Sequence, residues 1–309
     1  MTDDPALRLT ERRNPRTQRI DLASPREIVD LIAAEDATVP GAVAQAAADI
    51  TRALELVEAA FRAGGRLVYV GAGTSGRLGA LDAVECPPTF GTPPEMVIGV
   101  IAGGSAALLR AIEGAEDDVN AGIAAMDERR VGAADVVIGI AASGVTPFVR
   151  AALGRAQALG ARTVLLACAD PPKLLADTCD VCIVIRTGPE VVTGSTRMKA
   201  GTATKLVLNS LTTGAMIRLG KTYGNLMVDL RATSAKLVDR GERIVMEVTG
   251  VDRPTARVHI EAARGSVRTA ILMARTGLSL EQAEHRLAEH DHRLRAVIGD
   301  PPPMPPHDA

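Results

Sequence analysis

Aromatic residues are scarce in this chain of 309 residues, which has no tryptophan, two tyrosines and three phenylalanines. Proteins that hold single-stranded nucleic acid stack its bases on aromatic side chains, and this chain offers few such platforms. Basic charge is not in excess either, because 35 lysines and arginines face 37 acidic residues, for a formal net charge of −2. The composition therefore argues against a nucleic-acid-binding protein.

Long apolar runs are also missing. The first residues, MTDDPALRLTERRNPRTQ, are charged and contain no apolar core of a secretory signal. No uninterrupted apolar segment reaches the length of about 20 residues that a membrane-spanning helix needs. Four cysteines in a chain of this length indicate free thiols and a cytoplasmic location, without a membrane partner.

Two of these cysteines, Cys179 and Cys182, form a CxxC pattern at the start of a strand-like run. Residues three apart in a strand point to opposite faces, which suits neither metal chelation nor a dithiol pair. A zinc site would need a second ligand pair, and the sequence has none at that spacing. We therefore interpret both as structural cysteines and expect no metal and no cofactor.

Histidine is absent from the first two-thirds of the chain. The first of its five histidines is His259. A catalytic acid or base in the earlier part must therefore be Glu, Asp, Lys, Tyr or Cys. This absence directs attention to glutamates near ligand-binding loops.

From residue 67 onward, apolar strand patterns alternate with helical patterns. This alternation is typical of an α/β fold with a parallel sheet flanked by helices. The predicted strands are 67–70, 96–101, 135–140, 162–167 and 181–186, and the predicted helices between them are about 75–84, 105–113, 146–159 and 171–176. We also expect longer helices over 41–63 and 230–247, and a third that begins in the loop 188–205 and ends at about residue 219.

The chain divides into four predicted segments. Residues 1–40 form an N-terminal arm with a short helix at 26–33, and 41–247 form the sheet domain. A small bundle of three helices, 253–263, 266–275 and 279–297, occupies 248–299. The proline-rich residues 300–309 form a disordered tail.

The segment from Leu67 to Thr89, LVYVGAGTSGRLGALDAVECPPT, organises the prediction. Its glycines allow a tight turn after a strand, and the free amides of the following helix form a natural anion site beside Thr74 and Ser75. A dinucleotide site would need an acidic residue after the next strand, which instead runs into Ala102-Gly103-Gly104. The P-loop is excluded because Arg77-Leu78 replaces its Lys-Ser/Thr pair.

A carboxylate, Glu85, follows ten residues after Ser75 in an apolar setting closed by Cys86-Pro87-Pro88. A phosphate-binding loop with a carboxylate just beyond it suggests acid–base chemistry on a phosphorylated small molecule. Apolar shielding of such a carboxylate would raise its pKa toward neutrality.

Two further loops carry hydroxyls at the ends of predicted strands. One contains Ser143, Gly144 and Thr146, where Thr146-Pro147 also reads as an ordinary helix start. The other spans 188–205 and contains Ser195, Thr196 and Lys199. The acids of residues 113–118 follow the second strand; most form a solvated face, and spacing does not say which of them reaches the site.

These motifs resemble the N-acetylmuramic acid 6-phosphate etherases, sugar-isomerase (SIS) domain proteins of bacterial cell-wall sugar recycling that are related to the glucokinase regulatory protein. The resemblance covers about residues 10–299. Its carriers are TERRNPRT and IDLAS (10–24), EDATVP (35–40), GAGTSGRLGALDAVECPPTFG (71–91), IAGG with EGAED (101–117), AASGVTPFV (141–149), GPEVVTGSTRMKAGTATK (188–205) and GKTYGNLMVDL (220–230).

The resemblance implies cleavage of the D-lactyl ether of N-acetylmuramic acid 6-phosphate by elimination and then hydration, giving N-acetylglucosamine 6-phosphate and D-lactate. It assigns the two catalytic glutamates to Glu85, described as the proton donor, and Glu116. It implies a homodimer and no metal. The residues expected to bind substrate are Gly73, Thr74, Ser75, Ser143, Gly144, Thr146, Ser195, Thr196 and Lys199.

The chain departs from the family pattern at Val145, where arginine is usual, and at Thr204, where glutamine is usual. The first difference puts substrate affinity in question more than reaction type. Two other hypotheses remain, an SIS-type sugar-phosphate isomerase and a non-catalytic sugar-phosphate sensor. Retention of both Glu85 and Glu116 argues against the sensor.

Overall fold

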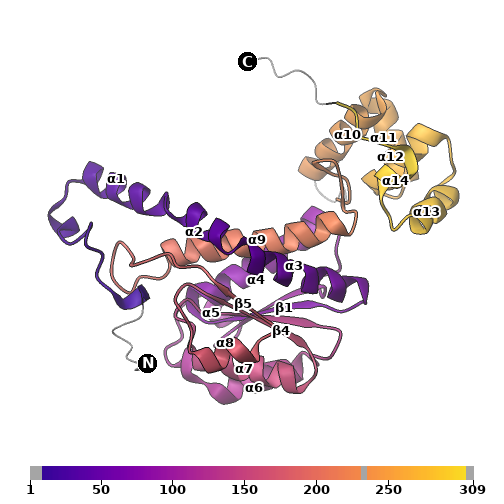
Figure 1. Cartoon of the computed structure of the whole chain (residues 1–309). Coiled ribbons are helices and arrows are strands. Elements are labelled where there is room, and N and C mark those ends of the chain that lie inside the picture. Colours follow the sequence, from indigo (N-terminus) through magenta and orange to yellow (C-terminus); the bar gives the residue numbers. More distant parts are fainter. Residues whose placement is uncertain (1–8, 231–234, 304–309) are drawn as a thin grey trace. The chain divides into compact units, whose positions relative to one another are not determined.

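The computed structural model describes residues 9–230 and 235–303 (Figure 1). Residues 304–309 of the predicted tail lie outside the described residues. The strands are β1 (Leu67–Gly71), β2 (Val97–Ile101), β3 (Val136–Ile140), β4 (Arg162–Ala167), β5 (Val181–Val184), β6 (Thr222–Tyr223) and β7 (Leu226–Met227). The helices are η2 (Leu9–Glu11), η3 (Ile20–Leu22), α1 (Pro25–Asp36), α2 (Val39–Gln45), α3 (Ala47–Arg62), α4 (Gly73–Phe90), α5 (Ala106–Leu109), η4 (Ala115–Asp117), α6 (Val119–Glu128), α7 (Pro147–Ala158), α8 (Lys173–Thr178), α9 (Lys199–Arg218), α10 (Ala235–Thr249), α11 (Arg253–Ala262), α12 (Val267–Thr276), α13 (Leu280–Glu289) and α14 (Leu294–Ile298).

Strands β1 to β5 form one parallel sheet in the order β2-β1-β3-β4-β5. All five predicted strands are confirmed, each to within two residues of its predicted ends. Val, Ile and Leu fill them because a sheet covered on both faces buries nearly every strand residue. The parallel α/β fold class is therefore correct.

The two faces of the sheet are covered by different helices (Figure 1). Val68 and Val70 of β1 pack with Phe148 and Leu153 of α7 in one buried cluster that also includes Met126 of α6. On the other face, Tyr69 turns toward α4, where a Cβ at Gly79 would lie 2.8 Å from the Cβ of Tyr69. A glycine at this position lets α4 approach the sheet closely.

A buried carboxylate joins three elements on that second face. The Asp82 carboxylate of α4 accepts hydrogen bonds from the Tyr69 hydroxyl at 2.9 Å and from Asn209 Nδ2 of α9 at 2.7 Å. It also accepts one from Thr212 Oγ1 at 3.2 Å. Burial raises the pKa of Asp82, and these hydrogen bonds offset part of that rise.

The chain groups into two compact units, one of residues 1–84 and 94–214 and the other of residues 85–93 and 215–309. The second unit contains a core of buried residues from Tyr223 to Leu294. It includes α10, which the sequence had placed with the sheet domain. Among the described residues, no helix combines the length and the apolar character that crossing a bilayer requires.

Several predicted helices have different bounds. The expected helix 279–297 is two helices, α13 and α14, because Asp291 and His292 between them adopt positive φ angles of 53° and 58°. Residues 41–63 likewise form two helices, which meet at Ala46. The prediction missed α6, whose first turn is capped by the Asp118 carboxylate accepting from the amide of Ala121 at 2.8 Å.

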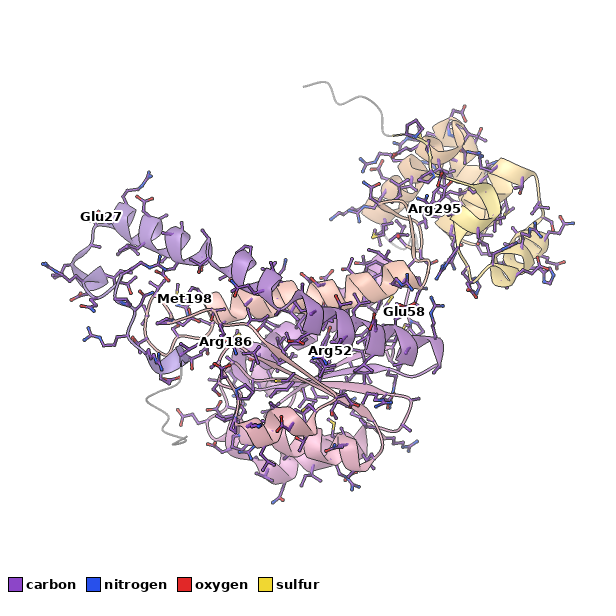
Figure 2. The ribbon with its side chains drawn as sticks, viewed as in Figure 1. Glu27, Arg52, Glu58, Arg186, Met198 and Arg295 are labelled. Atoms are coloured by element: carbon purple, nitrogen blue, oxygen red, sulfur yellow. The ribbon has the colours of Figure 1, made fainter. Side chains whose placement is uncertain are left out.

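The N-terminal arm contains a longer helix than expected. Helix α1 begins after Ser24, whose side chain and that of Glu27 form a reciprocal capping box, and Pro25 occupies the first helical position. Figure 2 shows Glu27 at the start of this helix and Met198 just before α9.

We expect Asp82→Ala to lower the free energy of unfolding by about 2 to 4 kcal/mol, because it leaves buried hydrogen-bond donors without an acceptor. Urea unfolding followed by circular dichroism measures this loss. Asp127→Ala is the control, since the Asp127 carboxylate is 45% exposed and pairs with Arg155 at the surface. The control should cost about 1 kcal/mol or less, and equal losses in the two variants would contradict the assignment.

Candidate active site at the carboxyl edge of the sheet

The strand order fixes where a ligand is expected to bind. In the order β2-β1-β3-β4-β5, the chain leaves β1 toward one side of the sheet and β3 toward the other. Open α/β sheets bind ligands outside the carboxyl ends of the strands at such a reversal. The loops that follow β1 and β3 are the predicted hydroxyl loops, and they flank this point.

The first loop passes directly from β1 into α4. Gly73 has a φ of +52°, and α4 begins there, two residues earlier than predicted. Thr74 and Ser75, both half-buried, therefore lie in the first turn of α4, where backbone amides lack intrahelical partners. An oxyanion in this position would meet amide donors, two hydroxyls and the positive end of the helix dipole.

The second loop connects β3 to α7. Gly144 has a φ of +75°, and a Cβ there would lie 2.8 Å from the Cβ of Pro171, in the loop after β4. Thr146 occupies the position before α7, but its side chain makes no capping hydrogen bond. The helix-cap interpretation therefore does not account for the Thr146 hydroxyl. Ser143 is half-buried in the same loop.

The third loop meets the first. A Cβ built at Gly201, in the first turn of α9, would lie 3.6 Å from the Cγ2 of Thr74 and 3.6 Å from the carbonyl oxygen of Thr196. Thr196 and the half-buried Ser195 are thus near the start of α4, although more than 120 residues separate them in sequence. Three of the predicted loops converge at one edge of the sheet.

Lys199 is held in a buried ion pair. Its Nζ donates to Glu35 Oε2 at 2.7 Å, and both side chains are only 2% exposed. Arg16 Nε contacts the other oxygen of Glu35 at 2.6 Å. The contact joins the N-terminal arm to α9, and Lys199 as a direct ligand of substrate stays a prediction.

Sequence reasoning missed Glu35 and Glu190 as parts of this region. The buried Glu190 carboxylate accepts the backbone amides of Lys199 and Ala200, each at 2.9 Å, and so caps α9. Burial raises the pKa of Glu190 although both amides oppose it. Glu35 lies 164 residues from Lys199, so local spacing offered no signal for their contact.

Of the two predicted catalytic glutamates, Glu116 lies close to the end of β2. Glu116 lies in η4, which packs against α7, and Ala115 beside it approaches Gly103 at the end of β2. Glu116 is exposed at the carboxyl edge of the sheet. Its position is compatible with the hydroxyl loops that flank β1 and β3.

Glu85 is not in the shielded setting that the sequence suggested. Helix α4 continues through Pro87 and Pro88 to Phe90 instead of ending near residue 84, and Glu85 lies exposed on its surface. Along a helix that rises about 1.5 Å per residue, Glu85 is about 15 Å beyond Ser75. A catalytic role for Glu85 beside the phosphate loop stays a prediction.

The positions where the chain departs from the family pattern lie in different surroundings. Val145 is half-buried in the loop before α7, whereas Thr204 is 2% exposed on α9. Thr204 neighbours Cys168, whose pKa burial raises to about 12. The threonine is thus part of the packed interior.

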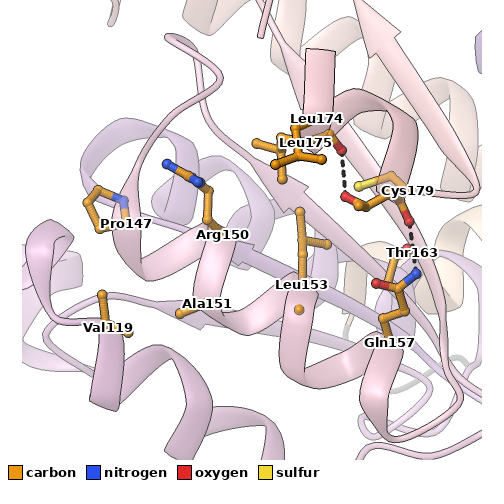
Figure 3. A pocket seen from close by; sticks show the side chains of 12 residues that line it. Val119, Pro147, Arg150, Ala151, Leu153, Gln157, Thr163, Leu174, Leu175 and Cys179 are labelled. Atoms are coloured by element: carbon orange, nitrogen blue, oxygen red, sulfur yellow. Dashed lines mark hydrogen bonds between the residues drawn. The ribbon is translucent and has the colours of Figure 1, made fainter. Parts of the chain in front are cut away.

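A cavity of about 530 Å³ between α7 and α8 is distinct from this edge (Figure 3). It is lined by Leu153 and Gln157 of α7 and by Leu174 of α8, and by none of the predicted site residues. Gln157 Nε2 donates to the Thr178 carbonyl at 3.0 Å across it. Cys179 lies on its wall, and burial raises the pKa of this thiol.

The Glu35 carboxylate yields a pH-dependent prediction. Burial alone would raise its pKa, but hydrogen bonds from Lys199 and Asn14 and the charges of Lys199 and Arg16 outweigh burial and lower it. A lowered folded pKa adds stability above the unfolded value of about 4.3, and this stability is lost as the pH falls. We therefore expect Glu35→Gln to cost about 3 to 5 kcal/mol at pH 7 and clearly less at pH 3.5.

Urea unfolding at both pH values measures this cost. Asp30→Asn, which removes an exposed α1 carboxylate paired with Arg26, is the control and should change stability little at either pH. A cost for Glu35→Gln that is the same at pH 7 and pH 3.5 would contradict the ion pair.

Comparison with known proteins supports a specific family. Residues 49–157 match the family model of the glucokinase regulatory protein N-terminal SIS domain. An N-acetylmuramic acid 6-phosphate etherase of Serratia proteamaculans is 51% identical over 94% of this chain and 97% of its own length. Those of Synechococcus sp. and Aeromonas hydrophila are 50% and 51% identical over 94% and 93% of the chain, and 92% and 96% of their own lengths. The chain belongs to the N-acetylmuramic acid 6-phosphate etherase family.

Proposed function

We propose that this protein cleaves the D-lactyl ether of N-acetylmuramic acid 6-phosphate, giving N-acetylglucosamine 6-phosphate and D-lactate. Identity of about 50% to etherases over nearly the whole chain carries this proposal. The hydroxyl loops at the strand-order reversal support it, because they offer donors for a phosphate ester.

The substrate phosphate binds at the start of α4 in this proposal. Thr74, Ser75 and the free amides of the first turn donate to its oxygens, and Gly73 lets it approach the backbone. Ser143, Gly144 and Thr146 contact the sugar from the loop after β3. Ser195, Thr196 and Lys199 close the site from the third loop.

The elimination requires two proton transfers, and the hydration that follows requires two more, from water and back to C2. After ring opening, a carboxylate removes the C2 proton, which the C1 aldehyde makes acidic, and the C3–O bond breaks as the C2–C3 double bond forms. A proton is supplied to the departing lactyl oxygen, and water then adds across the new double bond. We assign Glu116 as the base at C2 and Glu85 as the donor.

Two copies of the chain complete each site in this proposal. A helix that connects parallel neighbours such as β1 and β2 must run back toward the strands' amino ends, so the later part of α4 leads away from the carboxyl edge. Glu85 would therefore meet substrate held by a second copy. Beside it on α4, Leu81 and Val84 are 53% and 65% exposed, and an exposed apolar patch of this kind suits a homodimer contact.

We also infer a cytoplasmic location. A sugar phosphate is charged and is retained on the side of the membrane where it is made. All four cysteines are free thiols, in keeping with a reducing compartment.

Incubation of the purified protein with N-acetylmuramic acid 6-phosphate should release D-lactate, measured with a lactate dehydrogenase assay. Glu85→Gln and Glu116→Gln should each lower kcat by about 10²- to 10⁴-fold, the usual contribution of a general acid or base. Glu113→Gln is the matched control, because Glu113 is an exposed acid three residues from Glu116.

The outcome also separates the other two hypotheses. An isomerised sugar phosphate without lactate would indicate an isomerase. Saturable binding of the sugar phosphate without any turnover would indicate a sensor, and either result would overturn the proposal.

A further inference from the structure

A cavity of about 710 Å³ lies within the C-terminal unit, away from the hydroxyl loops in sequence. Its lining includes Gly91 directly after α4, Asp229, and the first turn of α12 with Ser266, Arg268 and Thr269. None of these residues has a role in the proposed etherase reaction. The cavity therefore needs an explanation of its own.

Arg268 is the chemically unusual residue of this cavity. Its side chain is 14% exposed, and its Nη2 contacts Asp229 Oδ1 at 3.1 Å. Nη1 donates to the His292 carbonyl only at 3.4 Å, longer than a good N–H···O hydrogen bond. Within the described ranges 9–230 and 235–303, the buried Nε has no hydrogen-bond partner.

The Asp229 carboxylate does not neutralise Arg268, because Lys221 shares it. Lys221 Nζ pairs with the same carboxylate, and the side chains of Lys221 and Asp229 are 20% and 12% exposed. Two cations thus face one anion in a largely buried cluster. Burial lowers the pKa of Arg268, and the charge of Asp229 opposes this only in part.

Other groups along the cavity wall do not remove the positive charge. Glu284 on α13 is exposed, and so is Arg264, which carries the opposite charge. Burial and the charge of Arg268 lower the pKa of His292, which favours its neutral form. The backbone amides at the start of α12 form the positive end of that helix's dipole, and they add to the positive potential of the cavity.

We propose that this cavity binds a small oxyanion, a phosphate ester or a carboxylate, through the guanidinium of Arg268. A planar guanidinium binds such groups with two parallel hydrogen bonds, and the Nε of Arg268 makes none to the described residues. The oxyanion supplies the negative charge that Asp229 alone does not.

The cavity also adjoins the helix that carries Glu85. Gly91 has a φ of +61°, and a Cβ there would lie 2.4 Å from the Asp229 carbonyl oxygen. The segment 85–93 belongs to the same compact unit as the cavity. An oxyanion at Arg268 would therefore be held beside the end of α4, and none of the residues proposed to bind the substrate phosphate lines this cavity.

Isothermal titration with inorganic phosphate, and separately with acetate, tests the proposal. All proteins would carry Thr74→Val and Ser75→Ala, which remove two hydroxyls of the proposed substrate-phosphate site, and only binding that responds to substitution of Arg268 counts, so that failure of the proposed function does not affect the result. On this background, saturable binding of phosphate or acetate is expected, and the tighter of the two identifies the ligand class. Arg268→Met should abolish it, and Arg268→Lys should weaken it by about tenfold because the paired hydrogen bonds are lost.

Arg286→Gln is the matched control, since Arg286 is an exposed arginine on α13 that pairs with Glu289 at the surface. It should leave the affinity unchanged. The Lys variant retains the charge beside Asp229 and keeps the test usable if the Met variant does not fold. Absence of saturable binding with both anions, or equal affinity in the Arg268 and Arg286 variants, would overturn the proposal.

Discussion

The fixed rise of an α-helix is the constraint on which this account depends. Helix α4 carries the proposed phosphate-binding turn at its first residues and Glu85 ten residues after Ser75. A helix cannot bring these two ends together, so Ser75 and Glu85 of one chain are about 15 Å apart along its axis. The proposed reaction uses both groups on one small sugar, and this is why we propose that two copies of the chain form each site.

A second constraint is the burial of charge at the start of α9. Lys199 forms a buried ion pair with Glu35, and the Glu190 carboxylate caps α9 by accepting two backbone hydrogen bonds. Breaking one partner of such a buried pair leaves an uncompensated charge. The contact therefore holds the N-terminal arm to the third loop and fixes the direction in which α9 begins.

The sequence predicted those features whose cause is local. Each strand of the sheet was visible as a short apolar run, and the hydroxyl loops followed because parallel strands place their carboxyl ends at one edge. The break between α13 and α14 was not visible, because it depends on the left-handed backbone of Asp291 and His292. The pairing of Glu35 with Lys199 was also hidden, since it joins residues 164 positions apart.

The environment of Glu85 was mispredicted for an instructive reason. The sequence predicts a helix that ends near residue 84 and an apolar setting closed by Cys86-Pro87-Pro88, but α4 continues through both prolines to Phe90. Cys86 is buried, but Val84 on the other side of Glu85 and Leu81 one turn before it are 65% and 53% exposed. Such shielding can still come from outside the single chain, because the exposed patch is where a second copy is proposed to pack.

Complementation between two inactive variants tests the shared site most directly. Glu85→Gln and Glu116→Gln chains carrying different affinity tags would be co-expressed, and the mixed dimer would be isolated by both tags. If each site takes Glu116 from one chain and Glu85 from the other, the mixed dimer has one intact site and recovers about half of the wild-type rate of D-lactate release. A mixed dimer as inactive as its parents would place both glutamates in one chain and contradict the account.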